Sequence, residues 1–197
     1  MKVIAIIQAR LNSTRLPGKM ALPLAGQMGW TQALVTAAAA KAGLSAPEAG
    51  LLLPHGPSDL AALLSRRHDR LAQEALSATD PMALKMRQRI SAGLLARLDA
   101  AAADEAALHR WAGYLALPHH MPLALRLVWE SADAIWRWAG DTATDENHYS
   151  KRAIVAGILA SALAVRLSSG DEAARALVAA RIDNVMAFEA WKAKRKP

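Results

Sequence analysis

From about Gln27 onward, the apolar residues of this chain recur at the spacing of α-helices, and this pattern constrains the fold more than any other feature. Alanine and leucine dominate the pattern, and no second run of β-branched residues follows the one at Val3–Ile7. A single strand cannot form a sheet. The sequence therefore predicts an all-α protein in which residues 27–197 form the helical domain and residues 1–26 form a short strand-loop extension.

Caps and helix breakers divide the helical part into about eight segments. Asp80 is followed by a proline, as an N-cap often is, and Gly43, Gly140 and Gly170 stand where helices are expected to end. The expected helices cover residues 31–42, 46–53, a segment opening at 57, 80–102, 104–117, 122–138, 141–167 and 171–194. This arrangement is typical of a helical bundle.

The basic charge of the chain is concentrated at its two ends. The net charge is +7, but residues 1–27 carry four basic and no acidic residues, and residues 192–197 carry four more. The remainder is close to neutral, which disfavours a DNA-binding body. The chain has no cysteine, so thiol catalysis, disulfides and cysteine-ligated metals are excluded.

The last expected helix carries an apolar stripe and ends in aromatic and basic residues. An anionic membrane surface attracts such a helix, although a closing helix of the bundle would show the same stripe. The candidate membrane contacts are Ile182, Val185, Met186, Phe188, Trp191, Lys192 and Lys194. We expect neither a secretory signal nor a transmembrane helix, because Val3–Ile7 and Ala153–Val165 are both too short.

Three of the six tryptophans lie in the expected helix 122–138. Trp136 and Trp138 are two positions apart, so they diverge by about 200° around the helix axis and cannot share one face. At least one of them is expected to line a groove, a dimer seam or a lipid cavity.

The sequence predicts no metal site, no cofactor and no catalytic residue. His119 and His120 are adjacent on an expected turn, where two side chains seldom point at one ion. Asp145 and His148 have the spacing of half a di-iron site, but the second copy that such a site requires is missing.

The first 26 residues suggest an enzymatic alternative. Gln8-Ala9-Arg10 and the stretch Ser13-Thr14-Arg15-Leu16-Pro17-Gly18-Lys19 resemble the opening motif of sugar-nucleotide cytidylyltransferases of the spore-coat polysaccharide type. The resemblance implies nucleotide binding by Arg10, Arg15 and Lys19.

A longer resemblance covers residues 28–194. Its motifs include Leu117-Pro118-His119-His120-Met121-Pro122, the block from Ala139 to Arg152 (AGDTATDENHYSKR), and Arg181-Ile182-Asp183-Asn184-Val185-Met186. On these residues the chain resembles the Coq-nine family of ubiquinone biosynthesis proteins. The resemblance implies a TetR-like fold, usually a homodimer, that binds isoprenoid lipid and presents it to the demethoxyubiquinone hydroxylase.

The same resemblance implies which residues form the sites. A lipid cavity would be lined by Leu125, Trp129, Trp136 and Ile158. The surface that faces the hydroxylase would contain Asp145, Asn147, His148, Tyr149 and Arg152.

We therefore predict a non-enzymatic lipid-binding accessory protein, located in the bacterial cytoplasm at the periphery of the inner membrane. A TetR-type DNA-binding regulator is a further alternative, but residues 42–65 contain neither lysine nor arginine to neutralise phosphate.

Overall fold

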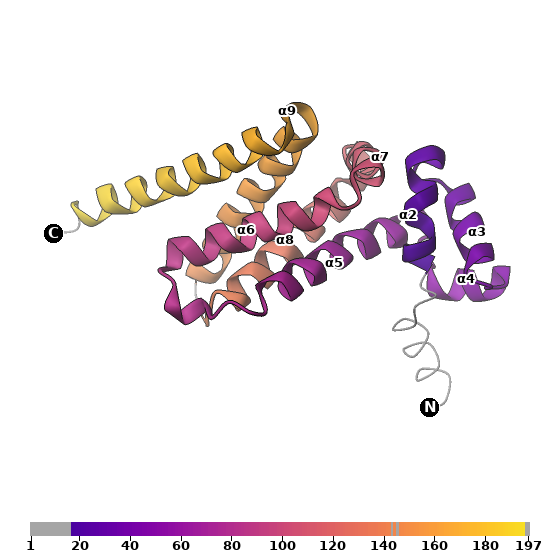
Figure 1. Ribbon diagram of the computed structural model, residues 1–197, viewed down its shortest axis with the longest axis horizontal. Coiled ribbons are helices and arrows are strands. Elements are labelled where there is room, and N and C mark those ends of the chain that lie inside the picture. The colour runs from indigo at the N-terminus through magenta and orange to yellow at the C-terminus, as the bar shows by residue number, and fades with distance from the viewer. Residues whose placement is uncertain (1–16, 143, 145, 196–197) are drawn as a thin grey trace. The chain divides into compact units, whose positions relative to one another are not determined.

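The computed structural model describes residues 17–142, 144 and 146–195, and every regular element in that part of the chain is helical (Figure 1). The all-α class expected from the sequence is confirmed, and the helices fit a TetR-like bundle. The chain divides into two compact units. The first contains the described residues up to Arg67 together with Ala102–Ala124, and the second contains His68–Ala101 and the chain from Leu125 onward.

The first unit is built on α2 (Pro17–Met28), α3 (Gln32–Lys41), α4 (Ala46–Leu52) and α7 (Glu105–Leu115), with the start of α5 (Pro57–Leu76). Helix α2 packs against both α3 and α7. Two buried tryptophans join these elements through their indole N–H groups. Trp30 donates to the carbonyl of Ala107 at 3.4 Å, and Trp111 donates to that of Ala61 at 2.9 Å.

Helix α2 was not expected from the sequence, and it crosses the boundary placed after residue 26. It begins at Pro17, a position where a helix tolerates proline because the missing N–H would have no partner there. A second proline, Pro23, lies inside the helix. Ala21 and Ala25 are buried, so this segment contributes to the core of the first unit. The expected strand at residues 3–7 lies outside the described residues.

Side-chain caps set the ends of α3 and α4 as their sequences suggest. The Thr31 hydroxyl accepts a hydrogen bond from the N–H of Leu34. Ser45 and Glu48 form a reciprocal capping box at the start of α4. Between the two helices, Gly43 adopts φ 69°, a conformation that glycine allows at little cost.

One expected helix begins later than its sequence predicts. The Asp80 carboxylate caps a single 3₁₀ turn at Pro81–Ala83 by accepting from the N–H of Met82 at 2.9 Å. Helix α6 begins only at Met86 and runs to Ala102. Asp80-Pro81 therefore starts a turn that precedes the helix, because the chain is extended at Leu84 between them.

The second unit packs α6 against α8 (Met121–Trp138) and α9 (Glu146–Ala193), with the end of α5. Helices α6 and α8 approach closely at Gly93 of α6, where an added Cβ would lie 2.7 Å from a methyl carbon of Ile135. Helix α9 bends sharply at Gly170, which has φ 88° and ψ −179° (Figure 1). The expected division into two helices at this glycine is confirmed.

Candidate functional site

An exposed aromatic surface lies where α8 faces the first turn of α9 in the second unit. The rings of Trp129 and Tyr149 are stacked with centroids 6.3 Å apart, and His148 contacts Tyr149 edge-on at 5.1 Å. Leu125 lies one helical turn before Trp129, on the same face of α8. Tyr149 is 64% exposed and Leu125 is 62% exposed. We call these four residues the aromatic surface.

A buried arginine joins α9 to the end of α8 beneath this surface. The Arg152 Nε donates to Asp133 at 2.6 Å, and its Nη1 donates to Asp141 at 3.0 Å. The same Nη1 donates to the backbone carbonyl of His148 at 3.2 Å. This last bond holds the backbone of His148, the residue that precedes Tyr149 on the aromatic surface.

The loop that carries Asp141 is set by the end of α8. Gly140 adopts φ 85°, and the N–H of Asp141 returns to the carbonyl of Trp136 at 3.0 Å. The helix end expected at this glycine is confirmed. Lys151 also donates to Asp141, at 2.9 Å, so two cations hold one largely buried carboxylate.

These contacts shift the acidity of Asp141. Burial of its carboxyl raises the pKa, but hydrogen bonds from Lys151 and Arg152, and the charges of both, outweigh burial and leave the pKa of Asp141 below its ordinary value. The carboxylate is therefore ionised at neutral pH and remains available to both cations.

The side chain of Trp136 on α8 is buried. Its indole N–H donates to the backbone carbonyl of Lys151 at 3.0 Å, and the Lys151 ammonium lies 5.4 Å from the indole centroid. Trp138 points elsewhere and lines a small cavity with Asp69 and Gln73. The expectation that the two tryptophans diverge is confirmed, whereas a groove, a dimer seam or a lipid cavity beside either of them stays a prediction.

The four residues predicted to line a lipid cavity do not share one environment. Leu125 and Trp129 lie on the aromatic surface. Trp136 and Ile158 are buried in the core of the second unit. The surface pair is accessible to a ligand, whereas the buried pair contributes to packing.

The residues predicted to face a partner divide in a similar way. Asn147 and Tyr149 are exposed, and His148 is half-buried beside them. Arg152 must be corrected, because its guanidinium is buried and bonded to two carboxylates, so it supports the surface from below. Asp145 lies outside the described residues.

A second buried arginine was missed at the sequence level. Arg97 of α6 is fully buried and donates to Asp69 of α5 at 2.6 Å, and the Ser131 hydroxyl of α8 donates to the same carboxylate oxygen at 2.6 Å. Desolvation lowers the pKa of Arg97, while the charge and hydrogen bond of Asp69 oppose that shift. The residues involved are 28 to 62 positions apart, so no local spacing could reveal the cluster.

The predicted membrane contacts lie on the second half of α9. Ala174 and Val178 are buried, but none of the side chains described between Arg181 and Trp191 is. Phe188 and Trp191 are stacked at 5.8 Å, and the guanidinium of Arg195 lies 4.2 Å from the Trp191 ring centroid.

The other predicted membrane contacts follow the same segment. Met186 and Lys194 are exposed, while Ile182 and Val185 are half-buried. The side chain of Lys192 lies outside the described part.

The turn at Gly170 is held by ion pairs. Arg166 and Arg175 both donate to Asp171, and Arg175 also reaches Asp99 of α6. The hydrogen bond from Arg175 is the main reason that the pKa of Asp171 lies below its ordinary value.

By length and composition alone, one helix in the described part, Glu146–Phe188, could cross a membrane. No transmembrane helix was expected from the sequence, because the apolar run Ala153–Val165 is shorter than a bilayer requires. A third of the most apolar 18-residue stretch of this helix is buried inside the protein, and the helix is kinked at Gly170.

The nucleotide-binding alternative falls largely outside the described residues. Arg10 and Arg15 precede the described part, and the side chain of Lys19 is not described. Pro17 and Gly18 belong to the start of α2, whereas the sequence placed them in a loop after a strand.

Comparison with known proteins places the candidate site in a defined segment. The COQ9 family model matches residues 121–189, which include the aromatic surface and Arg152. The chain is 28% identical over 158 residues to the mitochondrial ubiquinone biosynthesis protein COQ9-B of Xenopus laevis, covering 75% of this chain and 52% of that protein. The family model and this relative both indicate similarity to the COQ9 family.

A shorter segment matches more closely. The chain is 48% identical over 44 residues to mitochondrial COQ9 of Bos taurus, covering 22% of this chain and 14% of that protein. Human COQ9 is 46% identical over 44 residues, with the same coverage. The chain spans about half the length of the curated relatives that it matches over most of its own length.

Proposed function

We propose that this chain is a non-enzymatic accessory protein of ubiquinone biosynthesis, which binds an isoprenoid quinone intermediate and presents it to the demethoxyubiquinone hydroxylase. The COQ9 match supports the pathway, since the relatives are named ubiquinone biosynthesis proteins. The position of the aromatic surface within the matched residues supports the docking step.

The observation that carries the proposal is the stacked pair of Trp129, which is half-buried, and Tyr149, which is exposed. Solvent-exposed aromatic rings that pack against each other are typical anchors of protein interfaces. A surface site for a partner requires fixed backbone beneath it, and Arg152 provides this through its bond to the His148 carbonyl. We assign Tyr149 and Asn147 to the partner contact, with Arg152 as their support.

We place the isoprenoid contact at Leu125 and Trp129, on the same surface. Leu125 is exposed and Trp129 is half-buried, and an apolar chain lying along this face of α8 would reach the partner at Tyr149 without crossing the buried core. Trp136 and Ile158 keep a structural role in this proposal, because both are buried.

The second half of α9 is proposed as the contact with the membrane. Its exposed Phe188 and Trp191, beside Arg195, combine apolar rings with positive charge, which suits an anionic bilayer surface. This contact gives a protein at the periphery of the bacterial inner membrane. We further propose that it acts as a homodimer.

The docking step is tested by capture of the purified hydroxylase on immobilised protein. Tyr149→Ala and Trp129→Ala should each weaken capture at least tenfold, since central aromatic residues of interfaces contribute about 2 kcal/mol or more. The matched control is Leu51→Ala on α4, because Leu51 is 77% exposed and lies outside the aromatic surface. Capture that is equal in all four proteins contradicts the assignment.

The lipid step is tested separately by native mass spectrometry and organic extraction of the purified protein. Tyr149→Ala should retain its isoprenoid lipid while losing capture, and Trp129→Ala should lose both. The mass of the native complex gives the number of subunits. A protein that carries no lipid and remains monomeric contradicts the presentation mechanism.

A further inference from the structure

A groove lies between α3 and α4 in the first unit, and none of the residues that line it belongs to the aromatic surface or to the proposed membrane contact. Its volume is about 320 Å³. Helix α3 contributes residues such as Val35 and Ala39, and α4 contributes Ala46, Ala49 and Gly50. On each helix the lining residues recur three and four positions apart, so two helix faces meet across the groove.

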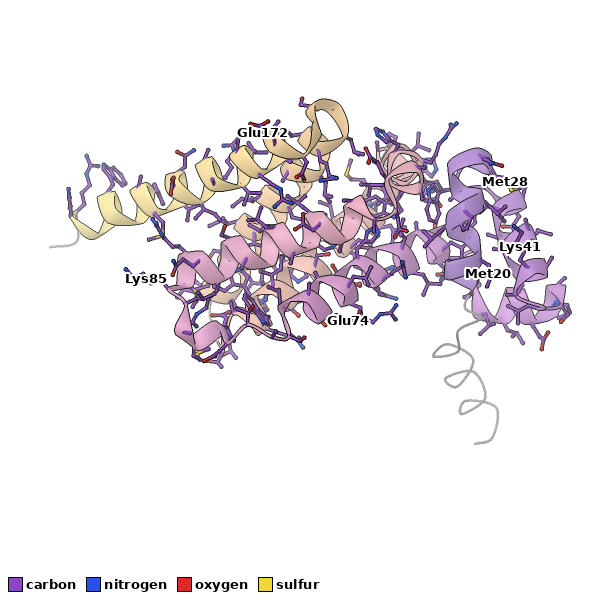
Figure 2. The ribbon with its side chains drawn as sticks, in the orientation of Figure 1. Met20, Met28, Lys41, Glu74, Lys85 and Glu172 are labelled. Carbon is purple, nitrogen blue, oxygen red and sulfur yellow. The ribbon has the colours of Figure 1, made fainter. Side chains whose placement is uncertain are left out.

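The groove exists because both faces carry small side chains. Packed interiors leave few voids larger than a water molecule, and leucine or isoleucine usually fills the space between two helices. Here five of the ten lining residues are alanine or glycine. The turn through Gly43 and the Ser45–Glu48 capping box fix the start of α4. Figure 2 marks the end of α3 at Lys41, where this turn begins.

The lining determines the chemistry of the occupant. Among the described residues no ionisable side chain lines the groove, and the polar side chains that line it are the carboxamide of Gln32 and the hydroxyl of Thr36. A charged ligand would lose hydration here without gaining an ionic partner. At roughly 30 Å³ for each water-sized group, the volume admits about ten methylene-sized groups. It lies at the lower end of the range for small-molecule sites, about 300–1,000 Å³.

We infer that the groove between α3 and α4 is a second ligand site, which binds a short, neutral, aliphatic molecule with a hydroxyl or carbonyl head. The aliphatic part lies between Ala39 and Gly50, and the head bonds to Gln32 or Thr36. This site is independent of the proposed role of the aromatic surface, which lies in the other unit.

The test uses the whole 197-residue chain with methyl-labelled valine and leucine, and 1-octanol as the probe. Saturable shifts are expected for the methyl resonances of Val35 and Leu53, both of which line the groove. Octanoate has the same chain length but a negative charge, and it should bind at least tenfold more weakly. Shifts that do not saturate, or equal affinity for octanoate, would overturn the proposal.

Gly50→Leu is the variant that fills the groove. A methyl group at Gly50 would have no atom within 4 Å, and leucine favours a helix more than glycine does, so the variant should fold. It should weaken binding of 1-octanol at least tenfold. Gly113→Leu on α7 is the matched control, because it makes the same change in the same unit at a position equally free of neighbours. Loss of binding in both variants, or in neither, would refute the site.

Discussion

Replacing Arg152 by alanine tests whether its buried ion pairs stabilise the second unit. The side chain of Arg152 is 3% exposed, and the change removes its contacts with Asp133, Asp141 and the His148 carbonyl. Removal of one partner from a buried charge pair costs about 3–5 kcal/mol, because the remaining charge stays buried without compensation. Lys151 still pairs with Asp141, so we expect a loss of about 3 kcal/mol.

Arg137→Ala is the matched control, because Arg137 bonds to the other oxygen of the same Asp133. Its Nε lies 2.8 Å from that oxygen, but its side chain is 75% exposed. An exposed pair of this kind contributes at most about 1 kcal/mol. The two variants therefore compare one carboxylate with a buried and an exposed arginine.

The free energy of unfolding is measured by urea titration with circular dichroism at neutral pH, and hydrogen exchange assigns the loss to the second unit. The exchange rates of amides around residues 146–152 should rise in Arg152→Ala and remain unchanged in Arg137→Ala. If the two variants differ by less than about 1 kcal/mol, Arg152 does not hold the site together as argued.

Three further predictions concern other parts of the second unit. Because the pKa of Asp141 is lowered in the folded protein, its carboxylate stabilises the fold above the unfolded-state pKa of about 3.9, and this stabilisation is lost as the pH falls through the folded-state pKa. Asp141→Asn should therefore flatten the acid limb of a plot of unfolding free energy against pH. Gly93→Ala should cost about 1–3 kcal/mol by thermal unfolding, since its Cβ would overlap Ile135. Trp191→Ala should reduce sedimentation with anionic vesicles several-fold without changing the melting temperature, because Trp191 is exposed; unchanged sedimentation would argue against a membrane contact there.

Most helix boundaries could be predicted from local sequence features. The helix ends at Gly43, Gly140 and Gly170 could be predicted because each requires a positive φ, and the three angles are 69°, 85° and 88°. Helix α2 escaped prediction because Pro17-Gly18 was interpreted as part of the strand-loop extension. Proline is tolerated at the first position of a helix, and the buried side chains described on α2 are the small alanines Ala21 and Ala25, which give a weak apolar pattern.

The candidate site was predictable only in part, because its chemistry depends on distant residues. In the sequence block around Tyr149, Asn147 and Tyr149 are exposed, His148 is half-buried and Arg152 is buried. Whether an arginine in that block is exposed or buried depends on carboxylates elsewhere. Arg152 finds Asp133 nineteen positions away and Asp141 eleven positions away, across the end of α8. Sequence spacing alone does not encode those distances.

The absence of buried side chains beyond Val178, among those described, has a consequence for the dynamics of α9. A helical segment of about a dozen residues is marginal in water unless tertiary packing supports it. Residues 181–193 therefore extend a packed helix without sharing its stability, and their amides should exchange with solvent well before those of residues 153–165. Burial of this segment against any surface would shift its helix–coil equilibrium, so amide protection there reports attachment directly.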